Sequence, residues 1–332
     1  MKIMMIGGGI QEVKAIEYAH ELGYEVLVTD KEPDAPCFKV ADYCEQIDGR
    51  NVEALIACAI EHEIDGVFTF TELVTSVATV SEAYDLDYCR IAPAVMCQNK
   101  HLAKEAWMHC DIPTPRGYVA ENKEQAKAIL TDFGGIGFAK PLVGFGGIGA
   151  GKVEDVHQLF RNNKRVLIEE YIEGTHHDAN TLITRYNDFI PLGITDRYFE
   201  DKRPWEREIR YPSVLSNKVQ HQIYDLLYRA AWVLGITKGP VKGDFILTDD
   251  GIKILEMAPR LHGPKNSLYV LPAVGIHPIE PLLQFITGAT VDNPYKLPNS
   301  PTHCIMRVGH TRKFEDWKLA TGYSFEECET KL

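Results

Sequence analysis

Residues 239–263 read GPVKGDFILTDDGIKILEMAPRLHG and decide how the rest of the chain is interpreted. An apolar run that contains Asp244 is followed by a Thr-Asp-Asp-Gly turn signal and by a second apolar run that ends in Glu256. Two such runs around a Gly-containing turn predict a β-hairpin. In that hairpin the two acids can lie side by side and share a cation, with Arg260 nearby, which is a combination suited to phosphate oxygens. The alternative is an ordinary hairpin whose acids face solvent.

The composition is that of a globular protein with a large core. The chain has 332 residues, 45% hydrophobic and 25% charged, which predicts two or three domains. A formal net charge of −12 argues against broad binding to nucleic acid or to an anionic membrane, while leaving room for a local basic pocket. We therefore expect small-molecule partners.

Targeting and redox signals indicate a cytoplasmic protein. No apolar run approaches the ~18–20 residues of a membrane-spanning helix, and the start, MKIMMIGGGI, breaks into glycines too early for a signal peptide. The eight cysteines form no Cys-x-x-Cys pair, so we expect reduced thiols rather than a zinc site or a disulfide framework.

The N-terminal stretch predicts an open α/β sheet. A strand over residues 2–6 leads through Gly7-Gly8-Gly9 into a helix and then into a second strand that ends in Asp30. A nicotinamide dinucleotide fingerprint would need a third glycine, which is missing, so a dehydrogenase is a weak alternative. Glu72 follows a later strand at the start of a helix, where ligands meet such sheets or where an acid simply complements the helix dipole.

A glycine-rich loop follows the strand predicted over residues 136–140. This strand ends in Lys140-Pro141, and residues 144–151 read GFGGIGAG. Closely spaced glycines leave backbone N–H groups free to cradle phosphates, and Lys140 adds a point charge. The loop lacks the Gly-Lys-Ser/Thr ending of a Walker loop. The alternative is a flexible surface loop.

Two further segments carry candidate chemistry. The run VLIEEYIEG at residues 166–174 is a strand that enters an acidic, aromatic hinge, whose backbone groups can pair with an adenine edge. Residues 196–212 form a basic, aromatic stretch that includes Arg210. We expect this stretch to be an irregular loop that either binds an anionic substrate group or is simply solvated.

The hairpin resembles the metal-binding hairpin of the ATP-grasp superfamily, in which a Glu-x-Asn-Pro-Arg run ends the second strand. Here the run is Glu256-Met257-Ala258-Pro259-Arg260, so Ala258 stands where a metal-binding Asn is usual and one metal has fewer protein ligands. Three other motifs of the superfamily occur in order: the helix start Asn99-Lys100 with its Ile-Pro-Thr-Pro turn, Lys140-Pro141 with the glycine loop, and the hinge that ends at Gly174.

The resemblance implies an α/β fold with three parts. Residues 1–97 would be an open parallel-sheet preATP-grasp domain that holds the acceptor substrate. Residues 98–174 would be the small lid and hinge, and residues 175–332 the large catalytic subdomain, so that the ATP-grasp module is a two-part α+β unit.

The resemblance also implies roles for particular residues. Arg260 would be catalytic, and Asp244 and Glu256 would be metal ligands. The ATP contacts would be Lys100, Lys140, Gly146, Gly147, Gly149, Glu169, Glu170, Ile172 and, for the ribose, His177. The substrate contacts would be Gln11, Glu12, Glu72, His262 and Gly263, and the basic stretch adds Arg210 as a further candidate.

The activity implied is an ADP-forming ligase that uses ATP and Mg²⁺, or Mn²⁺, to join a carboxylate, expected to be amino-acid-like, to an amine through an acyl phosphate. Alternatives of the same fold are a carboxylase or transformylase that uses bicarbonate or formate, and a non-catalytic ATP-binding regulator. A homodimer is a further open expectation.

Overall fold

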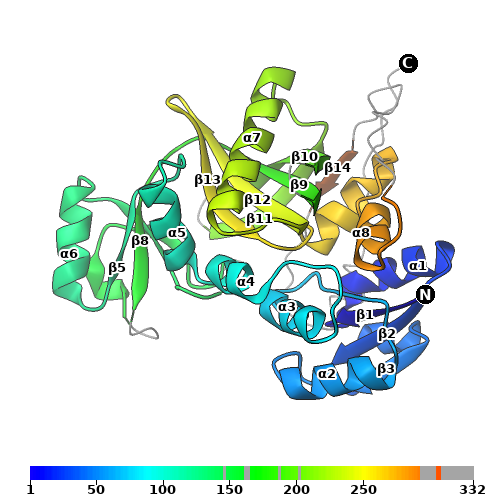
Figure 1. Ribbon diagram of the computed structural model, residues 1–332. Helices are drawn as coiled ribbons and strands as arrows, with labels where there is room; N and C mark the ends of the chain where they lie inside the picture. The colour runs from blue at the N-terminus through cyan, green and yellow to red at the C-terminus, as the bar shows by residue number, and fades with distance from the viewer. Residues whose placement is uncertain (145–146, 161–164, 186–187, 201–202, 292–303, 308–332) are drawn as a thin grey trace.

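The computed structural model describes all residues except 145–146, 161–164, 186–187, 201–202, 292–303 and 308–332. Three separate sheets organise this part of the chain (Figure 1). In the described residues no helix combines the length and the hydrophobicity needed to span a bilayer.

The N-terminal sheet is parallel, with strand order β3-β2-β1-β4. Its central strand β1 is almost fully buried, as expected of a parallel strand that is covered on both faces. The strands are β1 (Lys2–Ile6), β2 (Glu25–Asp30), β3 (Tyr43–Gln46) and β4 (Gly66–Phe68), and the helices are η1 (Ile10–Glu12), α1 (Val13–Glu21), η2 (Pro36–Lys39), α2 (Val52–Glu61) and α3 (Val74–Ala83).

The small sheet is antiparallel, with strand order β5-β8-β6-β7. The Asn99 side chain accepts hydrogen bonds from the backbone N–H groups of His101 and Leu102, which caps α5 and fixes Lys100 in its first turn. The strands are β5 (Gly117–Ala120), β6 (Gly137–Lys140), β7 (Gly151–Val153) and β8 (Val166–Glu170), with α4 (Ile91–Gln98), α5 (Lys100–His109), α6 (Lys123–Asp132) and η3 (Val156–Gln158).

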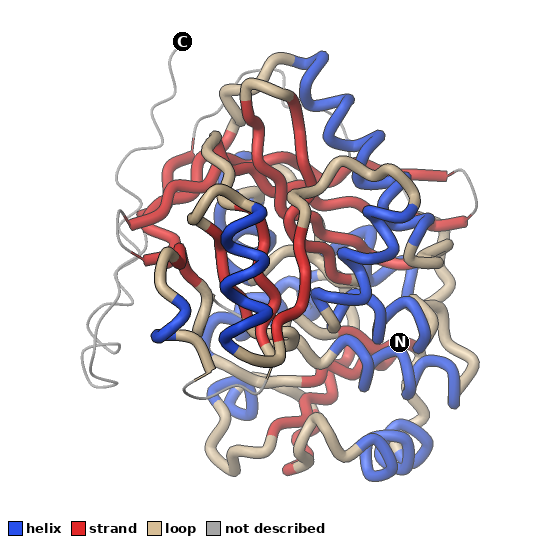
Figure 2. Tube along the Cα trace, turned by 90° about the vertical axis from the view of Figure 1, so that its left-hand side faces the viewer, coloured by secondary structure: helices blue, strands red, loops and turns tan. Residues whose placement is uncertain are grey.

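The large sheet is antiparallel, with strand order β13-β12-β9-β10-β11-β14, and Figure 2 shows its long strands side by side. The predicted hairpin forms its β12–β13 edge. The strands are β9 (Thr175–Arg185), β10 (Asp188–Glu200), β11 (Arg203–Tyr211), β12 (Gly239–Thr248), β13 (Gly251–Ala258) and β14 (Cys304–Arg307), with α7 (Asn217–Val233), η4 (Lys265–Val270), η5 (Pro272–Val274) and α8 (Ile279–Ile286).

The α/β fold class, with a parallel N-terminal sheet, is confirmed. The exact boundaries at residues 97 and 174 stay a prediction. The irregular loop expected over residues 196–212 is wrong, because most of this stretch belongs to β10 and β11. Its charged side chains pair within the sheet, as in the Arg197–Glu206 and His177–Asp196 contacts, so the usual apolar alternation of a strand is missing from the sequence.

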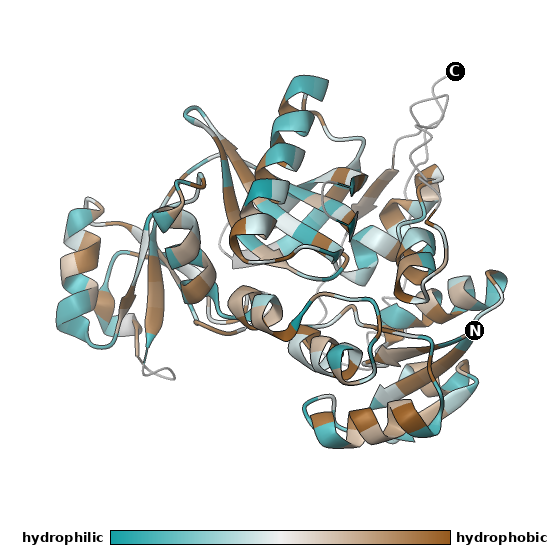
Figure 3. Cartoon of the chain, viewed as in Figure 1, coloured by the Kyte–Doolittle hydropathy of each residue, from teal (hydrophilic) through white to brown (hydrophobic). Residues whose placement is uncertain are grey.

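Four hydrophobic clusters form among the described residues, and two of them decide how the three sheets are joined. One core joins β1, β4 and α2 to β9, β12, α7 and α8, so the N-terminal sheet and the large sheet are packed together. The small sheet has its own core, which includes Leu130, Val166 and Ile168. Figure 3 shows hydrophobic residues along β1 and hydrophilic turns on α6 and α7. The small sheet is therefore the part that can move as a unit.

Gly174, at the end of the hinge, gives a test of this close packing. A Cβ at Gly174 would lie 2.2 Å from the backbone oxygen of Leu247. Gly174→Ala should lower the free energy of unfolding by about 1–3 kcal/mol in urea titrations, because β9 and β12 must separate. Gly151→Ala is the control, since its Cβ would meet nothing within 4 Å; equal stability of the two variants would contradict the prediction.

Candidate active site

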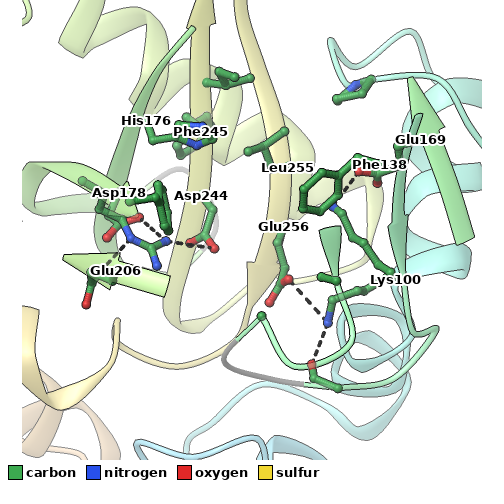
Figure 4. Close-up of a pocket in the computed structure, with 18 of the residues that line it drawn as sticks. Lys100, Phe138, Glu169, His176, Asp178, Glu206, Asp244, Phe245, Leu255 and Glu256 are labelled. Carbon is green, nitrogen blue, oxygen red and sulfur yellow. Dashed lines mark hydrogen bonds and ion pairs between the residues drawn. The ribbon is translucent and has the colours of Figure 1, made fainter. Parts of the chain in front are cut away.

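A cavity of about 810 Å³ lies between the small sheet and the large sheet (Figure 4). This volume is typical of a site for a nucleotide-sized ligand. Its walls include the two hairpin acids, Lys100, Lys140, the hinge and the turn that carries Arg260. Motifs that are far apart in the sequence therefore meet in one place. The predicted residues that line it are Glu72, Lys100, Lys140, Gly147, Glu169, Glu170, Ile172, His177, Asp244, Glu256, Arg260, His262 and Gly263.

The two hairpin acids face each other as predicted. Asp244 and Glu256 are cross-strand partners in the β12–β13 register. Lys242, two residues before Asp244, places its Nζ 3.1 and 3.2 Å from the two Asp244 oxygens and 3.4 Å from Glu256 Oε1. Burial alone would raise both carboxyl pKa values. The Lys242 ammonium outweighs burial and lowers the pKa of Asp244 far below its ordinary value, and Lys242 with Lys100 lowers that of Glu256 to about 2.

Lys100 and Lys140 both point into the cavity. Lys100 Nζ donates to the backbone oxygen of Gly144 at 2.7 Å and lies 3.4 Å from Glu256 Oε2, so it joins the glycine loop to the hairpin. Lys140 Nζ lies 2.6 Å from Glu169 Oε2. Gly147 lines the cavity, Gly149 lies in the loop without lining it, and Gly146 falls outside the described residues.

The hinge acids are held by basic side chains. Glu169 is buried between Lys140 and Lys104, whose Nζ lies 3.0 Å from Glu169 Oε1, and Glu170 pairs with Arg116 and Lys253. Burial lowers the pKa of Lys104 to about 8, whereas the two lysines outweigh burial and lower the pKa of Glu169. An adenine at this hinge is therefore left with backbone groups, and Ile172 stays the predicted partner.

His177, predicted for the ribose, lines the cavity with both ring nitrogens already in contact with neighbours. Its imidazole is 1% exposed and contacts Asp196 through Nδ1 at 2.7 Å and Thr175 through Nε2 at 2.7 Å. Its strand neighbours His176 and Asp178 line the cavity as well. Burial lowers the pKa of His176 to about 4, so its neutral ring is suited to hydroxyl groups. His177 stays the prediction for the ribose, and His176 lies beside it as a second candidate.

A second charged cluster in the cavity was missed from the sequence. Arg197 Nη1 lies 3.1 Å from Asp178 Oδ1 and 3.5 Å from Asp244 Oδ2, and its Nε donates to Glu206 at 2.8 Å (Figure 4). His262 Nε2 lies 3.0 Å from Asp178 Oδ2. Burial favours the neutral form of His262, but the Asp178 and Asp244 carboxylates outweigh it and raise its pKa. This cluster could have been predicted only from the pairing of β9 with β12, because Asp178 is the cross-strand partner of Asp244.

Arg260 lies at the end of the cavity next to the N-terminal sheet. Its Nη2 donates to Glu72 Oε1 at 2.5 Å, across 188 residues of sequence. The Arg260 charge also acts on the nearby Glu12 carboxyl group. Among the described residues, however, the cavity walls do not include Glu12, Gln11 or Arg210. Arg210 pairs with Glu208 and stacks over Tyr198, so its assignment to the substrate stays a prediction that these contacts do not support.

The carboxylate pair fits one Mg²⁺ better than two. Mg²⁺ binds through one or two carboxylates together with phosphate oxygens and water, which Asp244 and Glu256 can support with ATP. Ala258 offers no ligand atom, and the Lys242 ammonium already lies against both carboxylates. The Asp244–Glu256 pair by itself therefore suits a single ion, and Asp178 and His262 offer further ligand atoms beside Asp244.

The buried Glu169 pair gives a pH-dependent prediction. Lys104→Met should lower the free energy of unfolding by about 3 kcal/mol at pH 7, because Glu169 keeps Lys140 but loses its second buried partner. Glu169 has a lowered pKa in the folded protein, so its pairing stabilises above the unfolded value of 4.5 and is lost as pH falls through the folded value.

Urea titrations from pH 7 down to pH 3 would measure this effect. The difference in free energy of unfolding between wild type and Lys104→Met should become smaller as pH falls below 4.5. A protonated Glu169 carries no charge and therefore no longer needs a cation beside it. Lys127→Met, on the exposed side of α6, is the control for loss of a lysine. A difference in free energy of unfolding that does not change with pH would contradict the Lys104–Glu169 ion pair.

Comparison with known proteins places this geometry in a family. Residues 97–264, half of the chain, match the model of the ATP-grasp domain. A formate-dependent phosphoribosylglycinamide formyltransferase from Saccharolobus solfataricus is 28% identical over 280 residues, which are 79% of this chain and 70% of the relative. A Sinorhizobium fredii protein is 22% identical over 268 residues, 75% of this chain, and the chain spans only 55% of that relative's length.

The fold extends beyond the matched domain. The crystal structure of an L-amino acid ligase from Bacillus licheniformis superposes with a TM-score of 0.76 at 19% identity, covering 94% of this chain and 80% of the ligase. At this identity the likeness shows the fold alone. The expectation drawn from the hairpin, the lysines and the hinge is confirmed, and the chain belongs to the ATP-grasp family.

Proposed function

We propose that this chain is an ATP-dependent ligase that joins a carboxylate, amino-acid-like in character, to an amine and releases ADP and phosphate. One observation carries the proposal: the Asp244–Glu256 pair and the Arg260–Glu72 pair open into the same cavity. The first pair suits the phosphates of ATP. The second lies where an acceptor substrate would meet the γ-phosphate.

The Arg260–Glu72 pair is matched to a zwitterion. Arg260 is 7% exposed and fixed close to the wall, where the Tyr88 hydroxyl donates to the neighbouring Pro259 oxygen at 2.7 Å. A substrate carboxylate can replace Glu72 at the guanidinium, and a substrate ammonium can take the Glu72 carboxylate released by that exchange. An α-amino acid carries both groups.

The reaction follows from these positions. A substrate carboxylate oxygen attacks the γ-phosphorus, the bond to the β-phosphate oxygen breaks, and ADP leaves with the negative charge. Lys100, Lys140 and the glycine-loop N–H groups offset charge on the phosphates, while Arg260 stabilises the acyl-phosphate oxygens. An amine then attacks the acyl carbon, loses a proton and expels phosphate. Mg²⁺, which Asp244 and Glu256 would hold, would neutralise negative charge on the phosphates.

A transformylase is the second candidate, supported by the formate-dependent relative. Its name implies a phosphoribosyl acceptor, which needs cations or free N–H donors for its phosphate. In this chain the Gly8 N–H already donates to Asp30 Oδ2 at 2.7 Å, and Glu12 lies beside Gly9 in the same turn. Burial and the Asp30 charge raise the pKa of Glu12. Two acids at this turn disfavour a phosphate and support the amino-acid ligase.

A substrate screen separates the candidates. ADP formation is measured with ATP and Mg²⁺ against single and paired amino acids, formate with phosphoribosylglycinamide, and bicarbonate. We expect turnover with amino acids. Turnover only with formate or bicarbonate would favour the second candidate, and ATP binding without any turnover would favour a regulator.

Glu256→Gln tests the metal assignment. The substitution keeps the shape of the side chain and removes its charge, so ADP formation should fall at least about 100-fold while the protein stays folded by circular dichroism. Asp250→Asn, at the exposed turn of the same hairpin, is the matched control. Full activity of Glu256→Gln at ordinary Mg²⁺ would refute the assignment.

Glu72→Gln tests the acceptor assignment. Loss of the carboxylate should raise KM for the amino acid by about 10–100-fold, because one charge-assisted contact to the ammonium is removed. KM for ATP should stay the same, since Glu72 is predicted to contact the acceptor and not the nucleotide. A rise in KM for ATP with no change for the amino acid would place Glu72 in the nucleotide site.

A further inference from the structure

Lys242 takes a place that a cation would otherwise occupy. Its Nζ lies within 3.4 Å of three of the four oxygens of Asp244 and Glu256, and its side chain is 5% exposed. The lysine projects from β12 two residues before Asp244, hence from the same face of the strand. An ammonium that bridges two carboxylates has the position and the sign of charge of a bound metal ion.

Ala258 makes room for this lysine. Lys242 and Ala258 are direct cross-strand partners, as Asp244 and Glu256 are, so all four side chains lie on one face of the hairpin. Both Lys242 and Ala258 are 4% exposed, so the space between the strands is filled. A larger side chain at position 258 would compete with the lysine. The missing Asn ligand and the added lysine are therefore two parts of one arrangement.

The other cations near the two acids differ from Lys242 in one respect. Lys100 lies in the first turn of α5, whose Ala103 and Trp107 belong to the same core as the large sheet, and of the two acids it contacts only Glu256, at 3.4 Å from Oε2. Arg197 and His262 contact only Asp244 of the two acids, at 3.5 and 3.4 Å. Among these described cations only Lys242 contacts both acids, because it projects from the hairpin that carries them.

We propose, on the basis of the ligase function above, that the Lys242 ammonium is the resident second cation of this site, so that the enzyme binds a single divalent ion with ATP. Two carboxylates and one ammonium carry one net negative charge, which one divalent ion reverses. A second divalent ion would face both that ion and the ammonium with no ligand from Ala258. Lys242 thereby neutralises the carboxylates in the free and the ATP-bound states.

Counting Mn²⁺ tests this without any turnover. The free ion is titrated by electron paramagnetic resonance against the full chain, with a saturating non-hydrolysable ATP analogue. Wild type should bind one Mn²⁺ per chain. Two ions would overturn the inference and leave the ligase proposal standing. No bound ion would overturn the proposed function as well.

The double variant Lys242→Ala with Ala258→Asn should bind two Mn²⁺ per chain, because it removes the ammonium and adds an amide oxygen. Lys238→Ala, which removes a lysine just before β12 that pairs with Asp87 outside the cavity, is the control and should bind one. A folded double variant that still binds one ion would contradict the assignment.

A nucleotide-free measurement covers the case in which the double variant does not fold. Lys242→Gln leaves the two acids without their bridging cation, so Mg²⁺ should stabilise this variant more than wild type by mass action. We expect a rise in Tm with added MgCl₂ that is about twice that of wild type or larger. Equal shifts in the two proteins would count against a metal-like role for Lys242.

Discussion

The site depends on charge balance in a confined space. Asp244 and Glu256 are forced together by strand pairing, and two carboxylates at that separation repel unless cations lie between them. Lys242, Lys100, Arg197 and His262 supply these cations. Similar pairing continues along the cavity, where Lys104 and Lys140 enclose Glu169. The free protein thus holds a set of ion pairs that the phosphates and a metal ion can exchange with.

The distribution of hydrophobic cores decides which ion pairs can change. The N-terminal sheet and the large sheet share one core, and Arg260 meets Glu72 across that shared contact. The small sheet is packed separately and carries Lys140 and the glycine loop. Lys140 and the glycine loop, predicted to bind phosphates, therefore lie on a sheet with its own core, while Lys100, the Arg260–Glu72 pair and the hairpin acids lie on elements of the shared core. This division suits a reaction in which ATP must be enclosed before an acyl phosphate forms.

Local patterns in the sequence correctly predicted several of the helices and strands. The strand over residues 2–6, the helix cap at Asn99 and the hairpin are each specified by residues that lie close together in the sequence. Errors arose where a strand does not show apolar alternation. The stretch 196–212 looked irregular because its side chains are charged, yet ion pairs between neighbouring strands satisfy them.

The sequence by itself determined the family, the order of the motifs and the opposition of Asp244 and Glu256, because a turn and two short strands fix their own register. Only the tertiary structure decided what surrounds those acids. Lys242 fills the space opposite Ala258, Asp178 joins Asp244 through the β9–β12 pairing, and Glu72 reaches Arg260 from another sheet. Contacts of this kind depend on how distant segments pack and which face each strand presents, and no local pattern of residues specifies either.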